Sequence, residues 1–166
     1  MANKRLSYDS HPELPLDPDV VQPGRYRWPI HLTPALQLAV FIGGCFGTLA
    51  RYGVALRLPV QDGAWPAATF AVNMIGAFLL GFLLEALARA GKDKGRRRLI
   101  RLLVGTGFIG SFTTYSSLAV EIDLLSRNGH HMTAILYAWA TIIFGLILSI
   151  LGIQAASMYL KQRKKI

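Results

Sequence analysis

Four long stretches without a charged side chain are the feature that most limits how this sequence can fold. They hold 23, 22, 19 and 33 residues, at positions 28–50, 63–84, 102–120 and 128–160. A helix needs roughly 20 apolar residues to cross a bilayer. We therefore expect an all-α membrane protein with four transmembrane helices, at about residues 35–56, 64–87, 102–125 and 132–160.

The rest of the chain divides around these spans. Residues 1–34 are polar and rich in proline, which disfavours helix, so a disordered N-terminal tail is expected there. Residues 35–160 form the expected four-helix transmembrane domain. Residues 161–166 form a short basic C-terminal tail. Charged residues make up only 16% of the chain, against about 25% in soluble domains.

The meaning of the net charge of +9 depends on where the basic residues lie along the chain. The basic residues flank the apolar stretches, as topology signals do, and no basic stripe is interleaved with exposed aromatic residues. Nucleic acid is therefore not an expected partner. The sequence has no phosphate-binding loop, metal-ligand spacing or nucleophile elbow, so no enzyme is expected.

Polar residues inside the apolar stretches are the candidates for function, because each costs free energy in lipid unless it is paired or hydrated. Arg51 ends the first stretch, and snorkelling to the interface is its alternative explanation. Asn73 lies near the middle of the second stretch, where it could join helices or line a path. Tyr137 and Thr141 share one face of the last stretch. They either form a polar track that points inward or share that face by chance.

Residues 105–117 carry three glycines followed by five hydroxyl residues and a tyrosine. Glycine is a poor helix former, and Ser and Thr offer the backbone competing hydrogen bonds. A helix-packing face would place small residues along one stripe, whereas here they are consecutive. A broken third helix is therefore favoured, and such a break is tolerated at membrane depth only inside protein or beside a cavity.

Three segments together resemble the Fluc/CrcB fluoride channels in order and spacing. They are GGCFGTLARY at 43–52, FAVNMIGAFLLG at 70–81 and GFIGSFTTYSSLAVE at 107–121. The resemblance covers about residues 38–152. It implies a dual-pore channel in the cell membrane, built from two four-helix subunits in antiparallel orientation, which exports cytoplasmic fluoride passively and so gives fluoride resistance.

The resemblance also implies roles for individual residues. Arg51 corresponds to a vestibule position, and Glu121 to an acidic position after the third motif. A structural sodium ion would be held by the backbone carbonyls of Gly110 and Thr113. The positions expected to line the pore are Asn73, Thr114, Tyr115, Ser116, Ser117, Leu118, Tyr137 and Thr141.

The sequence departs from the family pattern at three of these positions. Ser111 replaces a glycine, and Tyr115 and Leu118 stand where phenylalanine is usual. An aromatic ring presents a positive edge to an anion. Tyr115 retains that edge and Leu118 does not, so we expect a pore lined by Leu118 to conduct poorly.

Two other functions fit a four-helix chain of this size. A small multidrug-type transporter needs a membrane-embedded acid on its first span, and residues 35–56 contain no Asp or Glu. A non-conducting partner subunit would suit the loss of an aromatic ring at Leu118. Fifteen Lys and Arg residues fall on the side of the termini and only two on the other. This bias predicts cytoplasmic termini and a heterodimer with an oppositely oriented homologue.

Overall fold

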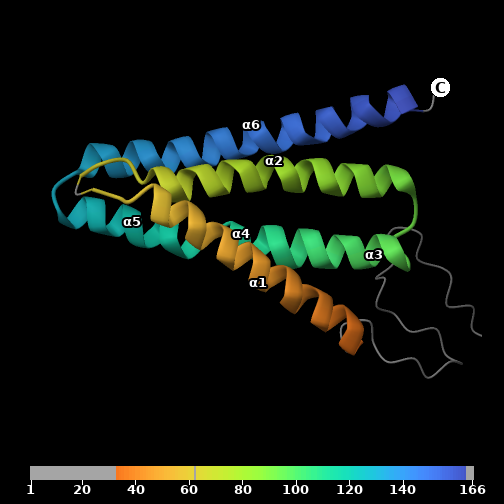
Figure 1. Cartoon of the computed structure of the whole chain (residues 1–166). Helices are drawn as coiled ribbons and strands as arrows, with labels where there is room; N and C mark the ends of the chain where they lie inside the picture. Colours follow the sequence, from red (N-terminus) through yellow and green to blue (C-terminus); the bar gives the residue numbers. More distant parts are fainter. Residues whose placement is uncertain (1–32, 62, 164–166) are drawn as a thin grey trace, which may run out of the picture. The chain divides into compact units, whose positions relative to one another are not determined.

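The computed structural model describes residues 33–61 and 63–163, all of whose regular elements are helices (Figure 1). Of the expected proline-rich tail at 1–34, residues 1–32 lie outside the described residues, and so do residues 164–166 of the expected basic tail at 161–166. From Pro34 onward the chain forms one compact unit. The helices are, in chain order, α1 (Pro34–Arg57), α2 (Ala67–Ala90), α3 (Arg96–Ile100), η2 (Arg101–Ile109), α4 (Gly110–Phe112), α5 (Tyr115–Arg127) and α6 (His131–Arg163).

Three of the described helices are long and apolar enough to cross a membrane: Pro34–Arg57, Ala67–Ala90 and His131–Lys161. Their limits agree within a few residues with three of the spans expected from the sequence. The remaining expected span, at 102–125, is divided between η2, α4 and α5, so it contains no single helix of comparable length.

Small residues allow the helices to approach closely. A Cβ on Gly43 or Gly47 of α1 would collide with the backbone of η2, at the carbonyls of Leu103 and Phe108 respectively. Likewise, a Cβ on Gly152 of α6 would collide with the Phe78 carbonyl of α2. Figure 1 shows the result, with α6 alongside α2 and α1 crossing over the segment that holds α4. Helix packing in lipid depends on such close backbone contact.

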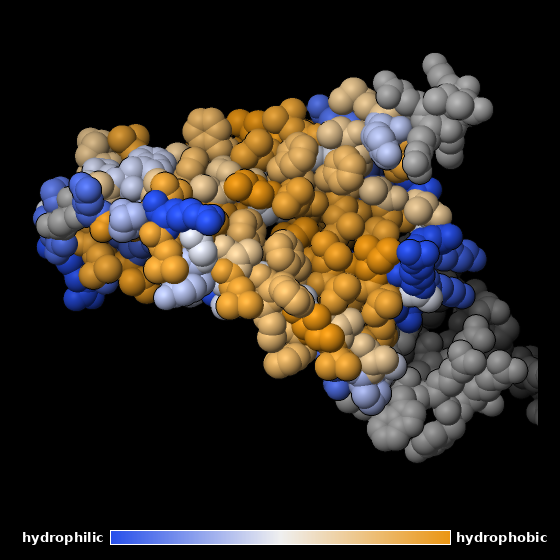
Figure 2. Space-filling view, in the orientation of Figure 1, coloured by the Kyte–Doolittle hydropathy of each residue, from blue (hydrophilic) through white to orange (hydrophobic). Residues whose placement is uncertain are grey.

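Most of the large apolar side chains on these helices point outward. Phe41 and Phe46 of α1 and Trp139 of α6 are all more than half exposed, and Figure 2 shows a broad hydrophobic surface over the helices. A helix that is apolar on its outer face as well as its inner face is suited to lipid or to a second protein chain.

Candidate functional site

The segment that joins η2 to α5 contains a short break in the helical backbone. The helix ends at Phe112, and Thr113 and Thr114 are extended, with φ/ψ of −82°/159° and −151°/122°. α5 then begins at Tyr115, with Thr114 as its N-cap: the Thr114 hydroxyl accepts a hydrogen bond from the Ser117 backbone N–H at 3.1 Å. Threonine is a preferred N-cap because its oxygen satisfies an otherwise unpaired N–H.

The side chain of Asn73 holds this break from the neighbouring helix α2. Its Nδ2 donates to the Thr114 carbonyl at 3.0 Å, and its Oδ1 accepts from the Thr114 backbone N–H at 2.8 Å. In a continuous helix that N–H would bond to the carbonyl of Gly110. The Asn73 amide therefore replaces a helical hydrogen bond and keeps one N–H of its own for another partner.

The helix before the break is π-helical, with wider turns than an α-helix. The Gly110 N–H donates to the carbonyl of Gly105, five residues earlier. Glycine has a low helix propensity, and Gly105, Gly107 and Gly110 all lie in or beside η2. π-Helical turns are uncommon and occur frequently at functional sites.

Three hydroxyl groups form a cluster at the start of α5. The Thr114 Oγ1 donates to the Ser117 Oγ at 3.1 Å and lies 3.2 Å from the Ser116 Oγ. Since Ser117 accepts from Thr114, its own O–H remains to donate elsewhere. The Thr141 hydroxyl differs, because it donates to the Tyr137 carbonyl of its own helix at 2.8 Å.

Glu121 is the centre of a second polar group, which joins three helices. Its carboxylate accepts from the Thr69 hydroxyl of α2 at 2.6 Å and from the Tyr137 hydroxyl of α6 at 2.7 Å. Tyr137 is fully buried. The Trp65 ring packs edge-on against it, with ring centroids 5.3 Å apart. These contacts fix the direction of the carboxylate.

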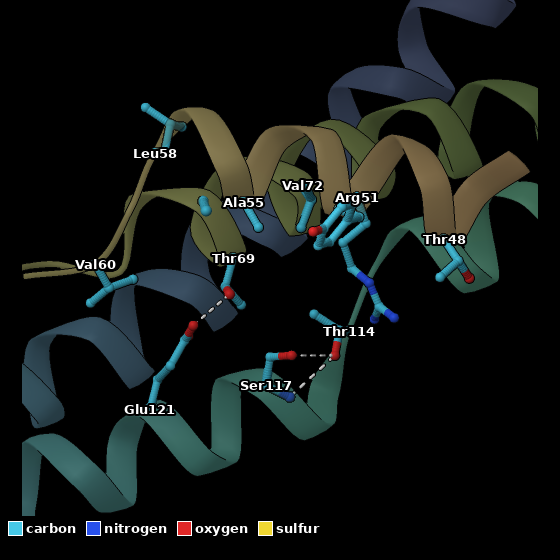
Figure 3. A pocket seen from close by; sticks show the side chains of 12 residues that line it. Thr48, Arg51, Ala55, Leu58, Val60, Thr69, Val72, Thr114, Ser117 and Glu121 are labelled. Carbon is cyan, nitrogen blue, oxygen red and sulfur yellow. Dashed lines mark hydrogen bonds between the residues drawn. The ribbon is translucent and has the colours of Figure 1, made fainter.

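A cavity of about 340 Å³ is lined by some residues of both polar groups (Figure 3). Arg51 lines it from α1, and Glu121, Ser117 and Thr114 line it from the break and α5. Within the described part of the chain, the Arg51 guanidinium has no acidic partner. The cavity therefore combines a guanidinium without a salt bridge, the Glu121 carboxylate and hydroxyl groups. Its other lining residues are Thr48, Tyr52, Ala55, Leu58, Val60, Ala68, Thr69 and Val72.

The structure separates the residues that the sequence proposed for one pore. Arg51, Thr114 and Ser117 line the cavity, whereas Tyr115 points away with 82% of its surface exposed, and Ser116 is also exposed.

Leu118 is buried in an apolar cluster with Leu125, Ala134 and Tyr137, and Thr141 is buried as well. Gly110 is the first residue of α4, and Thr113 directly follows its last residue. That any of these residues lines a pore or binds sodium stays a prediction.

Sequence reasoning missed Thr69 and Trp65, and it named Glu121 only as an acidic position. A usable signal was present for Thr69, which precedes Asn73 by four residues and so shares its helix face. For Glu121, the signal was a carboxylate one turn after Ser117, so that the two share a helix face. Nothing in the local sequence indicated that Trp65 packs on Tyr137.

Long apolar helices, an interrupted helix and a cavity lined by polar groups define a multi-pass membrane protein with an internal polar site. Comparison with known proteins supports this class of protein. Residues 38–153 match the family model described as "CrcB-like protein, Camphor Resistance (CrcB)". The chain belongs to this family.

Several curated relatives support the same assignment. "Fluoride-specific ion channel FluC 2" of Leifsonia xyli subsp. xyli is 46% identical over 129 residues, covering 78% of this chain and 88% of the relative. "Fluoride-specific ion channel FluC 1" of Cutibacterium acnes is 41% identical over 130 residues, covering 78% and 91%. "Fluoride-specific ion channel FluC" of Chlorobium chlorochromatii is 40% identical over 119 residues, covering 72% and 90%.

Proposed function

We propose that this chain is a subunit of a fluoride-selective channel that exports cytoplasmic fluoride passively. The observation that carries the proposal is the sequence identity of 37–46% with relatives named fluoride-specific ion channels. The segment matched to the family, residues 38–153, contains the break, Asn73 and the cavity. A channel, rather than an enzyme, is the activity that this family membership supports.

The chemistry of the cavity fits a small, strongly hydrated anion. A pore for fluoride must replace the lost water with several hydrogen-bond donors, yet release the ion again. The Ser117 hydroxyl and the Arg51 guanidinium line the cavity. Asn73 does not line it, but it bonds to the lining residue Thr114 and keeps a second N–H as a further donor. Arg51 would attract an anion to the cavity, while the neutral donors would pass it on without a further fixed cation that would trap it.

Tyr115 and large apolar side chains of α1 are exposed in the single chain, which supports a path completed by a second chain. We place the complete pore between two four-span subunits in antiparallel orientation, with the interrupted segment as the third span. In this arrangement the exposed Tyr115 ring would meet the partner chain and turn its edge toward the anion. Tyr137, Thr141, Ser116 and Leu118 would complete the lining.

We further propose a structural sodium ion at the centre of the dimer, held by the carbonyls of Gly110 and Thr113 from both subunits. Carbonyl oxygens suit a hard cation. The backbone supports this assignment, because the N–H of Thr114 is donated to Asn73 rather than to the Gly110 carbonyl. A helix that ends at Phe112 leaves carbonyls without partners in its last turn.

Efflux from liposomes tests the function directly. The purified chain is reconstituted with internal potassium fluoride, and release is followed with a fluoride electrode after valinomycin is added. Fluoride release without chloride release is expected. Failure of this chain both alone and with a homologous chain from the same organism would contradict the proposal, whereas release only with the homologue would identify an obligate partner.

A further inference from the structure

The turn between α2 and α3 carries an excess of positive charge that the channel proposal does not use. Residues 85–101 contain seven basic side chains and two acidic ones. The basic residues are Arg89, Lys92, Lys94, Arg96, Arg97, Arg98 and Arg101. Figure 2 shows a hydrophilic patch at this end of the helices, directly beside the hydrophobic surface.

Both acidic side chains in this region already have basic partners. Glu85 pairs with Arg89 and accepts a hydrogen bond from the Ser157 hydroxyl at 2.9 Å. Asp93 pairs with Arg101 at 2.8 Å and with Arg98 at 3.5 Å. The hydrogen bond from Arg101 lowers the pKa of Asp93, so its carboxylate stays ionised at neutral pH. These pairs occupy three of the seven basic residues.

The other four, Lys92, Lys94, Arg96 and Arg97, are exposed, and none has an acidic partner among residues 33–61 and 63–163. They project from a folded turn. The Arg97 guanidinium donates to the Lys92 carbonyl at 3.1 Å, and the Arg98 guanidinium to the Asp93 carbonyl at 2.7 Å. The charges are therefore held close together rather than dispersed on a flexible loop.

The position of this turn selects lipid over other anions. α2 is long and apolar enough to cross the membrane and ends at Ala90, so the turn lies at the level of the phospholipid headgroups. Leu99 of α3 is 40% exposed beside the arginines. A phospholipid offers both a phosphate for the cations and an acyl chain for Leu99, whereas free phosphate and acidic proteins lack the acyl chain.

We propose that the α2–α3 turn, residues 91–96 together with Arg97 and Leu99, binds the headgroups of anionic phospholipids. Clusters of four or more basic residues beside a transmembrane helix are typical of such binding. The site is separate from the polar cavity, and the proposal does not depend on fluoride transport.

Native mass spectrometry of the full chain in detergent tests the proposal. Equal amounts of phosphatidylglycerol and phosphatidylcholine are added, and the bound fraction of each is measured. We expect the wild-type chain to prefer phosphatidylglycerol. In the variant Lys92→Gln/Lys94→Gln/Arg96→Gln, the ratio of bound phosphatidylglycerol to bound phosphatidylcholine should fall at least about tenfold.

The matched control is Arg57→Gln/Arg127→Gln, which removes two exposed basic residues outside this turn and should keep the preference. Lys94→Arg, which retains the charge, should also keep it. An unchanged preference in the triple variant would overturn the proposal.

Competition experiments use the wild-type chain, so their result does not depend on whether a variant folds correctly. Millimolar inorganic phosphate should leave phosphatidylglycerol bound, while raised salt should weaken it. Displacement by inorganic phosphate would show a free-phosphate site instead, and displacement by a polyglutamate peptide would show a site for acidic proteins. Either result would reject lipid as the ligand.

Discussion

At the scale of single residues, Asn73 connects backbone geometry to the proposed path. Its amide accepts the Thr114 N–H and donates to the Thr114 carbonyl, so the same side chain holds the break and offers its remaining N–H to an anion. Only a group with both a donor and an acceptor can make this pair of bonds. We therefore expect Asn73 to tolerate no isosteric replacement.

Asn73→Asp tests this dual role. An ionised Asp keeps the acceptor for the Thr114 N–H but leaves the Thr114 carbonyl without its donor, at a cost of about 1–3 kcal/mol. It also places a negative charge in an anion path. Fluoride efflux should fall at least tenfold, while Gln61→Glu, the same change on an exposed turn, should leave efflux near wild type. Normal efflux from Asn73→Asp would contradict the role of Asn73.

Tyr115 tests the contribution of a ring edge. Tyr115→Phe keeps the ring and should preserve fluoride efflux, whereas Tyr115→Ile removes the positive edge and should reduce efflux sharply. Because Tyr115 is 82% exposed in the single chain, neither change should lower the stability of the subunit. Unchanged efflux from both variants would remove Tyr115 from the pore.

At the scale of helices, stability depends on the close crossing of α1 and η2. A methyl group on Gly47 would collide with the Phe108 carbonyl, while one on Gly53 of the same helix meets nothing within 4 Å. Backbone cannot move aside as a flexible side chain can, so the two glycines form a matched pair.

Gly47→Ala should lower stability by about 1–3 kcal/mol, the usual cost of overpacking. Gly53→Ala should be neutral or stabilising by up to about 1 kcal/mol, because alanine is the better helix former. Thermal unfolding in detergent, followed by circular dichroism, measures both. Equal melting temperatures for the two variants would show that the contact contributes little.

Some of these helices could be predicted from the sequence better than others. α1, α2 and α6 follow from long, mostly apolar stretches, which determine a membrane helix locally. Gly105 and Gly107 in η2 and Gly110 at the start of α4 weaken the helix before α5. The end of the helical backbone at Phe112, however, also depends on Asn73 in another helix. A contact between residues 41 positions apart leaves no trace in a local pattern.

At the scale of the whole molecule, the candidate site is assembled from helices distant in the sequence. Thr69, Glu121 and Tyr137 come from α2, α5 and α6 and meet at one carboxylate. Sequence reasoning identified most of the polar residues, because intramembrane polarity is itself a signal. It could not predict which of the proposed pore residues lie together. Leu118 packs in the core, for example, while Tyr115, three residues earlier, is exposed.

The distribution of charge predicts the orientation of the chain. With four spans, the termini and the turn between the second and third spans share one side and hold fifteen Lys and Arg residues, against two on the other. Positive residues are retained in the cytoplasm, so this chain should insert one way, with cytoplasmic termini. The antiparallel dimer proposed above would then need a second, oppositely oriented chain.

The last prediction tests this orientation. Cys45 is the single cysteine, so Cys45→Ala combined with Lys161→Cys places one thiol at the exposed end of α6. A membrane-impermeant maleimide should label this variant only after the cells are lysed. The matched variant Cys45→Ala/Arg57→Cys, at the other end of a span, should be labelled in intact cells. Labelling of Lys161→Cys in part before lysis, and in full only after it, would indicate both orientations. Together with fluoride efflux from this chain alone, it would establish a homodimer instead.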